Sequence, residues 1–470
     1  MINRQEIMDF AREMGLDPNV IEKDYVLGWL LAGISSHPAL SSHWVFKGGT
    51  CLKKCFFETY RFSEDLDFTI TNPDHLDQEF LVTIFKGIAQ WVYEASGIEM
   101  PEDRIHFKVY ENVRGHISVE GRIGYRGPLQ RRGDPPRIKL DLTNDELLVL
   151  EPLLREVHHP YSDKPADGIH VLCYCFEEVF AEKLRALAER ERPRDLYDVV
   201  HLYQHDMRPD FSIVMATLEK KCSFKGIAVP TLKALEDRPE RAELESEWKN
   251  MLAHQLPTLP PFENFWDEVS AILDWLHGAI PAEAPVHIPI RGEIDAAWRP
   301  PAMAQPWHFA VPLEIIRFAA SNRLCVDLEY QRTWRLIEPY SLRKTRDGNL
   351  LLFAVKHETG ESRSYRVDRI QGAKATSVSF VPKYLIELTP SGAVSAPPLI
   401  RQSSGFKTSE QRFSKLAYLG QRLGPAYIIQ CSYCGKRFNR KAYVTNLNPH
   451  KDKQGYPCPG RTGYLVDTKY

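Results

Sequence analysis

The stretch Trp44–Ile70 reads WVFKGGTCLKKCFFETYRFSEDLDFTI, and it decides how the first half of the chain is understood. A strand-like apolar run ends at Gly48-Gly49-Thr50, and an amphipathic segment then leads to a second β-type run. A glycine turn before a helix exposes backbone N–H groups that attract phosphate. Gly48, Gly49 and Thr50 are therefore candidates for binding a phosphate group. An ordinary turn is the alternative for the same residues.

Two aspartates open the second β-type run. Asp65 and Asp67 are two residues apart, so on a strand both side chains project from one face. Two like charges held together are destabilising unless a cation lies between them, and a divalent metal with oxygen ligands meets that need. The alternative is a solvent-facing strand edge. Asp141, in a later strand, is a candidate third carboxylate or an ordinary polar strand residue.

Length and charge limit the classes to which the protein can belong. At 470 residues the chain is long enough for two to four domains of about 100–200 residues each. The formal net charge of -2 does not favour nucleic acid, but from Arg401 onward thirteen Lys and Arg oppose three Asp and Glu, a local net charge of +10. The sequence shows no signal pattern and no apolar run near the roughly 18 residues of a membrane span. We expect a cytoplasmic protein with reduced thiols and no membrane partner.

Hydrophobic periodicity predicts the elements around the opening stretch. Helices are expected at residues 2–15, 20–34, 79–97, 176–191 and 194–203, with further helix over 211–277, and strands at 44–46, 105–111, 117–124 and 138–143. Lys183 falls in the middle of a helix, where an exposed lysine is usual. Asp195 is a candidate N-cap, and Asp198 lies one turn beyond Arg194. The basic turn at 126–137 suits a polyphosphate or RNA backbone, or is a solvated loop.

Four motifs follow one another at a characteristic spacing. They are Phe46-Lys47-Gly48-Gly49-Thr50, Arg61-Phe62-Ser63-Glu64-Asp65-Leu66-Asp67-Phe68, Glu182-Lys183-Leu184-Arg185-Ala186-Leu187 and Arg194-Asp195-Leu196-Tyr197-Asp198. Together they resemble the AbiEii/AbiGii toxin family over residues 1–280. Members of that family are nucleotidyltransferases of the DNA polymerase β-like superfamily, found as toxins of type IV toxin–antitoxin and phage-abortive systems. The resemblance implies an α+β fold with a helical part.

The same resemblance implies roles for individual residues. It implies that nucleotide phosphates are bound by Gly48, Gly49, Thr50, Arg194 and Asp195. It implies a catalytic set of Ser63, Asp65, Asp67, Lys183 and Asp198, with magnesium held by Asp65, Asp67 and Asp141. The implied reaction transfers a nucleoside monophosphate from an NTP to RNA, often tRNA, or to a protein, and releases pyrophosphate. An antitoxin or another defence-system protein is the implied partner.

A proline-rich segment at 281–307 reads as a linker, and the pattern changes after it. A short helix is expected at 313–320, and short strands at 325–330, 333–336, 349–354, 362–367 and 376–380, as in a small barrel. The strings Glu329-Tyr330, Arg335–Tyr340, Leu350–Ala354 and Arg363–Ile370 resemble a WYL domain, an Sm-like barrel, over 308–392. Leu351-Leu352-Phe353 lies near the place of the missing Trp-Tyr-Leu tripeptide. The resemblance implies an anion-favouring pocket, for which ordinary surface charge is the alternative, formed by Tyr330, Arg335, Arg363, Arg366 and Arg369.

The C-terminal residues 426–470 follow a basic linker or helix at 393–425 and contain a cysteine motif. Cys431-Ser432-Tyr433-Cys434 is followed by His450 and Cys458, a spacing that predicts a structural zinc ion with four ligands in a tetrahedron. Basic and aromatic residues interleave around it and suit a nucleic-acid backbone. They are Tyr433, Lys436, Arg437, Phe438, Arg440, Lys441, Tyr443, Lys451 and Lys453.

The leading hypothesis is a magnesium-dependent nucleotidyltransferase that acts as a toxin or phage-defence effector. Its C-terminal half would sense or bind nucleic acid. One alternative is a nucleic-acid-binding regulator whose WYL-like domain and zinc finger remain while the transferase half is inactive. Another is a nucleotide-binding scaffold in a larger complex. Because Gly49, Ser63, Asp65, Asp67, Lys183 and Asp198 are all present, the sequence favours the enzyme.

Overall fold

The computed structural model forms two compact units, Met1–Arg401 and Gln402–Tyr470, and each is described by itself. The predicted segment 393–425 and most of 281–307 lie outside the residues that the structure describes. Those residues are 1–57, 60–112, 114–204, 209–279, 286–289, 294–295, 313–388, 426–440, 445–447, 450–452 and 457–469.

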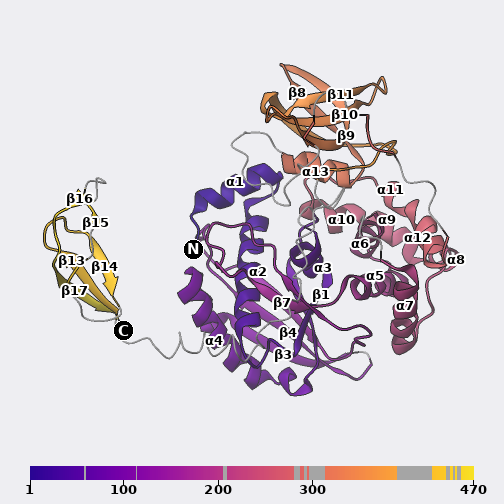
Figure 1. Cartoon of the computed structure of the whole chain (residues 1–470). Helices are drawn as coiled ribbons and strands as arrows, with labels where there is room; N and C mark the ends of the chain where they lie inside the picture. Colours follow the sequence, from indigo (N-terminus) through magenta and orange to yellow (C-terminus); the bar gives the residue numbers. More distant parts are fainter. Residues whose placement is uncertain are drawn as a thin grey trace. The chain divides into compact units, whose positions relative to one another are not determined.

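A seven-stranded mixed sheet forms the centre of the first unit, in the order β3-β4-β5-β2-β1-β7-β6 (Figure 1). Strand β1 is antiparallel to β2 and parallel to β7, and β2 is parallel to β5. The strands predicted from the sequence are confirmed to within a residue or two. They are β1 (Trp44–Lys47), β2 (Asp65–Ile70), β3 (Ile105–Glu111), β4 (Ile117–Gly124) and β5 (Arg137–Thr143). The sheet also contains two short strands that the sequence did not predict, β6 (Leu153–Glu156) and β7 (His170–Cys173).

Helices flank this sheet, with α2 and α4 on its left in Figure 1 and α5 to α12 on its right. The mixed α+β class expected from the sequence is confirmed. The region 211–277 is divided into short helices, because glycine and several prolines interrupt it. The helices are α1 (Arg4–Met14), α2 (Pro18–Ser36), α4 (Gln78–Ser96), α5 (Phe176–Arg190), α6 (Pro193–Gln204), α7 (Phe211–Lys225), α8 (Leu232–Glu236), α9 (Glu240–Ser246), α10 (Trp248–Leu252), α11 (Glu263–Trp266) and α12 (Glu268–Leu276).

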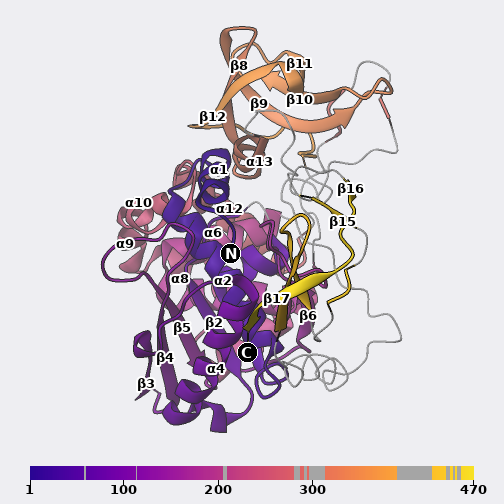
Figure 2. The same cartoon turned by 90° about the vertical axis from the view of Figure 1, so that its left-hand side faces the viewer.

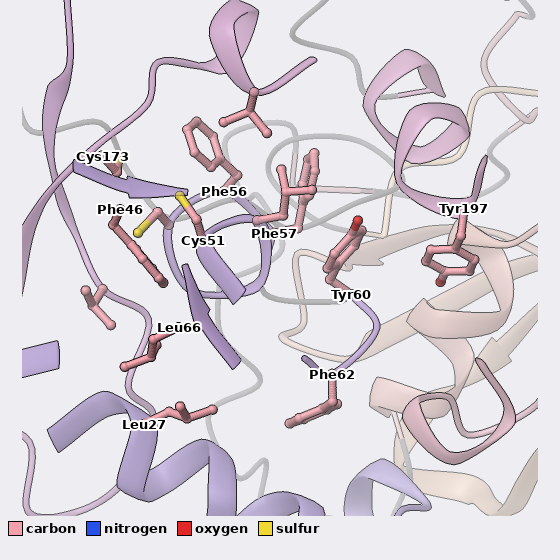
Figure 3. Close-up of a cluster of buried hydrophobic side chains, with 14 of the residues drawn as sticks. Leu27, Phe46, Cys51, Phe56, Phe57, Tyr60, Phe62, Leu66, Cys173 and Tyr197 are labelled. Atoms are coloured by element: carbon pink, nitrogen blue, oxygen red, sulfur yellow. The ribbon is translucent and has the colours of Figure 1, made fainter. Parts of the chain in front are cut away.

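The connection from β1 to β2 carries the opening motif. Helix α3 (Gly48–Cys51) begins at the first glycine, where the sequence indicated a glycine turn before a helix, and continues as a π-helical turn, Leu52–Phe56. Leu66 and Phe68 of β2 are fully buried in the core, part of which Figure 3 shows around Phe46 and Leu66. Because successive residues of a strand point to opposite faces, this burial turns Asp65 and Asp67 away from the core.

The first unit also contains a second, five-stranded antiparallel sheet in the order β11-β10-β9-β8-β12, with α13 (Leu313–Ser321) packed on it (Figure 2). Strands β9 and β12 are several residues longer than the sequence predicted. In β9 the chain passes through Pro339 at a point where the register with β10 shifts. The bounds are β8 (Leu324–Tyr330), β9 (Thr333–Lys344), β10 (Leu350–Lys356), β11 (Ser362–Arg366) and β12 (Ile370–Ser379).

Described parts of the expected linker 281–307 pack beside this second sheet. Val286 forms a bridge to Tyr384, and Ile294 forms one to Thr345. Ile288 is buried with residues of the sheet. These residues therefore contribute to the packing of the domain that follows them.

The second unit is small and built from short strands. Three of them, β13 (Ala426–Cys431), β14 (Arg437–Arg440) and β17 (Gly463–Lys469), form one sheet, while β15 (His450–Lys451) pairs with β16 (Pro457–Cys458). Its buried cluster consists of Ile429, Cys431, Leu447 and Cys458. In the described parts of the whole chain, no helix has both the length and the apolar character that crossing a membrane requires.

Candidate active site and metal centres

Three carboxylates meet on neighbouring strands, which favours the third-carboxylate alternative for Asp141 over an ordinary strand residue. Asp67 of β2 is in register with Asp141 of β5 on one side and with Lys47 of β1 on the other. Asp65 lies two residues before Asp67 on the same face. All four residues line a cavity of about 440 Å³. The geometry thus brings the expected acidic set together, and its role as a metal site stays a prediction.

Electrostatics favour a cation at this acidic set. Burial, together with the charge of Asp141, raises the pKa of Asp67 to about 6. Burial also raises the pKa of Asp65, while Lys23 and Lys139 oppose that rise. Lys139 Nζ already lies 2.8 Å from Asp141 Oδ2. Oxygen donors crowded in this way form the kind of ligand set that magnesium prefers, so the residues fit the ion that the family implies.

The two glycines of the opening motif make room for polar side chains. Gly48 has a φ of +80°, and a Cβ there would lie 2.1 Å from Asp67 Oδ2. A Cβ on Gly49 would lie 2.6 Å from Arg61 Nη2. Thr50 is buried and donates its hydroxyl to the carbonyl of Asp65. The structure gives these three residues a positioning function, and direct phosphate contacts by them stay a prediction.

Lys183 of α5 is held by Asp198 of α6. Its side chain is buried, unlike most lysines in the middle of a helix, and its Nζ lies 2.7 Å from Asp198 Oδ2. Arg61 binds the same carboxylate through Nε at 2.7 Å and Nη2 at 2.8 Å. Burial alone would raise the pKa of Asp198, but Arg61 and Lys183 hold it well below its usual range.

Asp198 differs from the other predicted catalytic residues in its position. Its side chain is fully buried, and Asp198 does not belong to the residues that line the cavity, whereas Arg61, Ser63 and Lys183 do. Asp198 instead positions two cations that face the cavity, and its place in the catalytic set stays a prediction. Direct contact between Asp198 and a nucleotide is not favoured by this geometry.

The prediction that Asp195 is an N-cap is wrong. Helix α6 begins at Pro193, so Asp195 lies inside its first turn. Proline is favoured at the first helical position because its missing N–H has no partner there in any case. The carboxylate of Asp195 instead binds Arg190 through two hydrogen bonds of 2.7 and 2.9 Å. Asp195 does line the cavity, as its predicted place in the site requires.

More lysine and arginine side chains line the cavity than the sequence motifs indicated. Arg192 and Arg194 line it and form no ion pair with any residue in the described part of the chain. Arg61 was visible in the second motif, but only its burial against Asp198 reveals its function. The cations that the sequence analysis did not assign to the site are Lys47, Arg61, Lys139, Arg185, Arg190 and Arg192.

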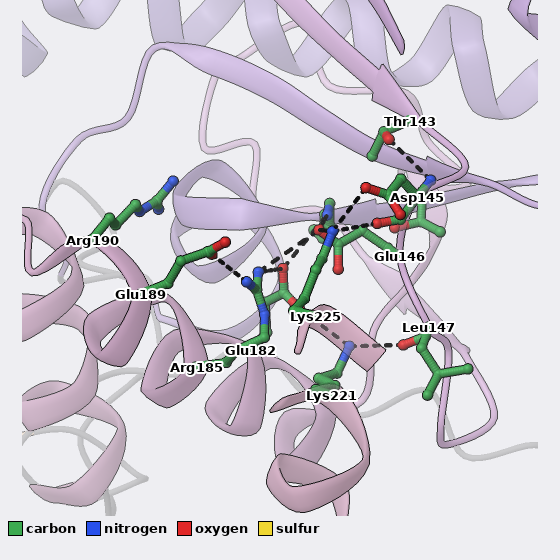
Figure 4. Close-up of polar contacts among 12 residues, drawn as sticks. Thr143, Asp145, Glu146, Leu147, Glu182, Arg185, Glu189, Arg190, Lys221 and Lys225 are labelled. Carbon is green, nitrogen blue, oxygen red and sulfur yellow. Dashed lines mark hydrogen bonds and ion pairs between the residues drawn. The ribbon is translucent and has the colours of Figure 1, made fainter. Parts of the chain in front are cut away.

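A buried ion-pair network supports one wall of the cavity (Figure 4). Lys47 Nζ lies 3.4 Å from Glu146 and 3.5 Å from Glu182. Glu182 also binds Lys221 of α7 at 3.1 Å. Burial would raise the pKa of Glu182, but Lys47 and Lys221 lower it well below its usual value. The network joins β1, α5, α7 and the segment after β5, so it fixes Lys47 beside Asp67.

Comparison with known proteins identifies the family. A family model described as the nucleotidyl transferase AbiEii toxin of type IV toxin–antitoxin systems matches residues 29–273, more than half of the chain. The chain belongs to the AbiEii toxin family. A second family model, the WYL domain, matches residues 312–375. Both resemblances inferred from the sequence are confirmed, and the AbiEii half is a nucleotidyltransferase by family.

Similar solved structures also include nucleotidyltransferase toxins. MenT4, a nucleotidyltransferase toxin from Mycobacterium tuberculosis H37Rv, is 18% identical, with 60% of this chain and 91% of that chain covered and a TM-score of 0.38. JHP933 from Helicobacter pylori is 15% identical, with 56% and 94% covered and a TM-score of 0.36. PafBC of Arthrobacter aurescens is 14% identical, with 62% and 41% covered and a TM-score of 0.14. No curated protein matches the chain.

The C-terminal unit brings together the four predicted zinc ligands. Cys431, Cys434, His450 and Cys458 have ligand atoms that all lie within 4.8 Å of one another. Cys434 Sγ is 3.3 Å from His450 Nε2, and Cys431 Sγ is 3.9 Å from Cys458 Sγ. The pairing of β15 with β16 sets His450 opposite Cys458, which closes the long gap in the sequence. Three thiols and one imidazole form a donor set that fits zinc.

A second thiol cluster lies in the AbiEii half. Cys51, Cys55 and Cys173 are buried, and their sulfur atoms lie within 4.8 Å of one another. Figure 3 shows Cys51 and Cys173 beside Phe46. The buried guanidinium of Arg155 also reaches the cluster and donates to the Cys55 carbonyl at 2.7 Å. Free cysteine in the interior commonly packs as a small hydrophobic residue.

The predicted pocket of the WYL domain is only partly assembled. Arg335 lies over the ring of Tyr330 at 5.8 Å and donates to its carbonyl. Arg363 pairs with Glu361. Arg366 pairs with Asp368 in the same way, at 2.7 Å. Arg369 is exposed. Arg335 thus contacts Tyr330, Arg363 and Arg366 have local acidic partners, and Arg369 faces solvent, so an anion-binding pocket stays a prediction.

Proposed function

We propose that this AbiEii-family chain transfers a nucleoside monophosphate from an NTP to a hydroxyl group of RNA, with tRNA as the first acceptor to test, and that it acts as a toxin or defence effector. The observation that carries the proposal is the placement of Asp65, Asp67 and Asp141 on neighbouring strands at a cavity that Lys183, Arg192 and Arg194 also line. Carboxylates for metal ions and fixed cations for phosphates are what nucleotidyl transfer needs.

The residues that line the cavity would have different functions in the reaction. Magnesium ions held by Asp65, Asp67 and Asp141 would supply neutralisation of the triphosphate charge. Lys183, fixed by its ion pair with Asp198, offers a preorganised cation to the charge that builds on the leaving pyrophosphate. Arg192 has no carboxylate partner among the described residues and is available to phosphate oxygens.

The proposed step forms one bond and breaks one bond. The acceptor oxygen bonds to the α-phosphorus, and the bond from that phosphorus to the bridging oxygen of the β-phosphate breaks. Pyrophosphate leaves with the electron pair of the broken bond. The proton of the acceptor hydroxyl passes to the carboxylate side of the cavity. The chemistry therefore balances without an oxidant or reductant.

The test incubates the full chain with each α-labelled NTP, magnesium and total RNA. We expect label in the tRNA fraction for the wild type and none for Asp65→Asn with Asp67→Asn. Asp103 is exposed and does not line the cavity, so Asp103→Asn is the matched control and should keep full transfer. Label in no fraction with any NTP refutes the transferase proposal. Label on the protein alone refutes the RNA acceptor, and its loss in Ser63→Ala then identifies self-modification.

The regulator hypothesis predicts a different result. It requires nucleic-acid binding that is unaffected by Asp65→Asn with Asp67→Asn and no transfer by the wild type. The complete set of carboxylates and cations around the cavity counts against an inactive transferase half. An antitoxin partner belongs to the same proposal, because the family is part of type IV toxin–antitoxin systems.

The C-terminal unit is proposed to hold one structural zinc ion. Its buried cluster is small, and domains of this size commonly need a metal or disulfides to fold. Metal analysis of the purified full chain should give one zinc per chain, and Cys431→Ser with Cys434→Ser should remove it. Cys173→Ser is the matched control. Retention of zinc in the double variant, or its loss in Cys173→Ser alone, would assign the ion to the buried thiol cluster instead.

A further inference from the structure

Asn322, directly after α13, belongs to the WYL half of the chain but contacts the transferase half. Its Oδ1 accepts a hydrogen bond from the Tyr197 hydroxyl at 3.1 Å and lies 3.2 Å from His201 Nε2. Its Nδ2 donates to the carbonyl of Phe318 at 2.9 Å and to the hydroxyl of Ser321 at 3.2 Å. Because the nitrogen has two acceptors, the network fixes which end of the amide is the oxygen.

The histidine in this contact is neutral. Burial lowers the pKa of His201 to about 4. His201 faces an oxygen that can only accept, so its Nε2 carries the proton and donates to Asn322. One oxygen of Asn322 thus holds two side chains of α6, and the Asn322 side chain is itself buried.

Tyr60 connects these two side chains to the cavity wall. Its ring centroid lies 5.9 Å from that of Tyr197 and 5.6 Å from that of His201. Figure 3 shows Tyr60 and Tyr197 as neighbours in the core. The hydroxyl of Tyr60 donates to Asp198 Oδ1, and the other oxygen of Asp198 binds Lys183 at 2.7 Å.

We propose that Asn322 is a positioning residue of the nucleotidyltransferase site. By holding Tyr197 and His201, it fixes the packing around Tyr60 and Asp198 and thereby the place of Lys183 at the cavity. The transferase site is then incomplete without α13. For its catalytic readout the proposal rests on the transfer activity proposed above.

The position of Asn322 also joins the site to the second sheet. The next residue, Arg323, accepts a hydrogen bond from the Phe380 backbone N–H at 2.9 Å, and β8 begins at Leu324. A displacement of this sheet therefore reaches Lys183 through packed and hydrogen-bonded side chains. Energetic coupling between two sites is reciprocal, so nucleotide in the cavity would in turn bias the sheet.

The test compares Asn322→Ala with Thr258→Ala in the full chain. Thr258 also bridges the two halves, since its hydroxyl donates to the Ala375 carbonyl at 3.2 Å, but it contacts none of the residues between Asn322 and Lys183. For Asn322→Ala we expect kcat for transfer to fall about three- to thirtyfold while the KM for NTP changes less than about twofold. Thr258→Ala should leave both unchanged.

A milder variant and a double variant separate positioning from general destabilisation. Tyr197→Phe keeps the ring and removes only the hydroxyl that reaches Asn322, so it should lower kcat without a large shift in the unfolding midpoint. Asn322→Ala and Tyr197→Phe both remove the same hydrogen bond. The fold-reduction in kcat of the double variant should therefore be smaller than the product of the two single fold-reductions. Multiplicative losses would overturn the proposal.

A readout that needs no activity keeps this proposal distinct from the transferase proposal. Lys183 is pinned by Asp198, so its rate of labelling by a lysine-reactive ester, followed by peptide mass spectrometry, should rise in Asn322→Ala and stay at the wild-type rate in Thr258→Ala. If the wild type transfers no label to any acceptor, the proposed function fails while this readout still tests Asn322. Equal labelling in wild type and Asn322→Ala refutes the positioning function of Asn322.

Discussion

Replacement of Asp67 by Asn should stabilise the fold while it abolishes transfer. Asp67 is in register between Lys47 and Asp141, and burial and the Asp141 charge raise its pKa from 3.8 to about 6. Because the folded-state pKa is raised, the ionised carboxylate costs stability at neutral pH. The stability that the protonated Asp67 side chain contributes is fully present below its ordinary pKa of 3.8 and is lost as the pH rises through about 6.

The size of the effect follows from the pKa. A rise from 3.8 to about 6 corresponds to about 3 kcal/mol at pH 7.5 without metal. Because water reaches part of the carboxylate, we expect Asp67→Asn to gain about half of that, about 1–2 kcal/mol. For a domain of this size that gain raises the unfolding midpoint by about 2–6 °C.

The assay is thermal unfolding of the full chain with EDTA, at pH values from 4 to 8. Asp67→Asn and wild type should unfold together near pH 4, and the variant should unfold at a higher temperature from pH 6 upward. Magnesium should then stabilise the wild type and close the gap, because an ion that binds only the folded state stabilises it by mass action. The variant should respond much less to magnesium.

Asp145→Asn is the matched control with the opposite sign. Lys225 at 3.2 Å and neighbouring donors lower the pKa of Asp145 although burial opposes them. Its charge therefore stabilises the fold above its ordinary pKa, so the Asn variant should be less stable at pH 7.5 and approach the wild type as the pH falls. A pH-independent loss of stability in Asp67→Asn would contradict the raised pKa of Asp67. A response of the variant to magnesium equal to that of the wild type would contradict its place in a magnesium site.

Three further outcomes follow from the cavity. Gly48→Ala should lower the free energy of unfolding by about 1–3 kcal/mol, because Gly48 has a φ of +80° and the new Cβ would lie 2.1 Å from Asp67 Oδ2. The same clash should remove the stabilisation by magnesium, which urea unfolding with and without magnesium checks. Asp198→Asn should cost about 3–5 kcal/mol because two buried cations lose their partner, as measured by the unfolding midpoint against wild type. Thr50→Val should lose about 1 kcal/mol and lower kcat through the lost hydrogen bond to the Asp65 carbonyl, while Thr50→Ser retains both; equal kinetics for the two variants would contradict this.

Much of the fold was predictable because local patterns carry it. The alternation of β2 buries Leu66 and Phe68 and turns Asp65 and Asp67 to the other face, which any strand imposes. The helical periods of α4 and α5 and the cysteine spacing at Cys431 were equally readable. Predictions failed where a boundary depends on special residues, as at Asp195, which follows a proline that begins the helix two residues earlier.

The sequence alone was enough to recognise the AbiEii and WYL halves, the acidic strand and the cluster of Cys431, Cys434, His450 and Cys458, because motif spacing and the strand and helix periods are local properties. Tertiary packing alone places Asp141 beside Asp67, joins Arg61 to Asp198 across 137 residues, and brings Asn322 into contact with α6. These contacts depend on how distant elements pack against one another. The hydrophobic periodicity of a helix or strand shows which of its faces is buried, but it does not show which other element packs against that face.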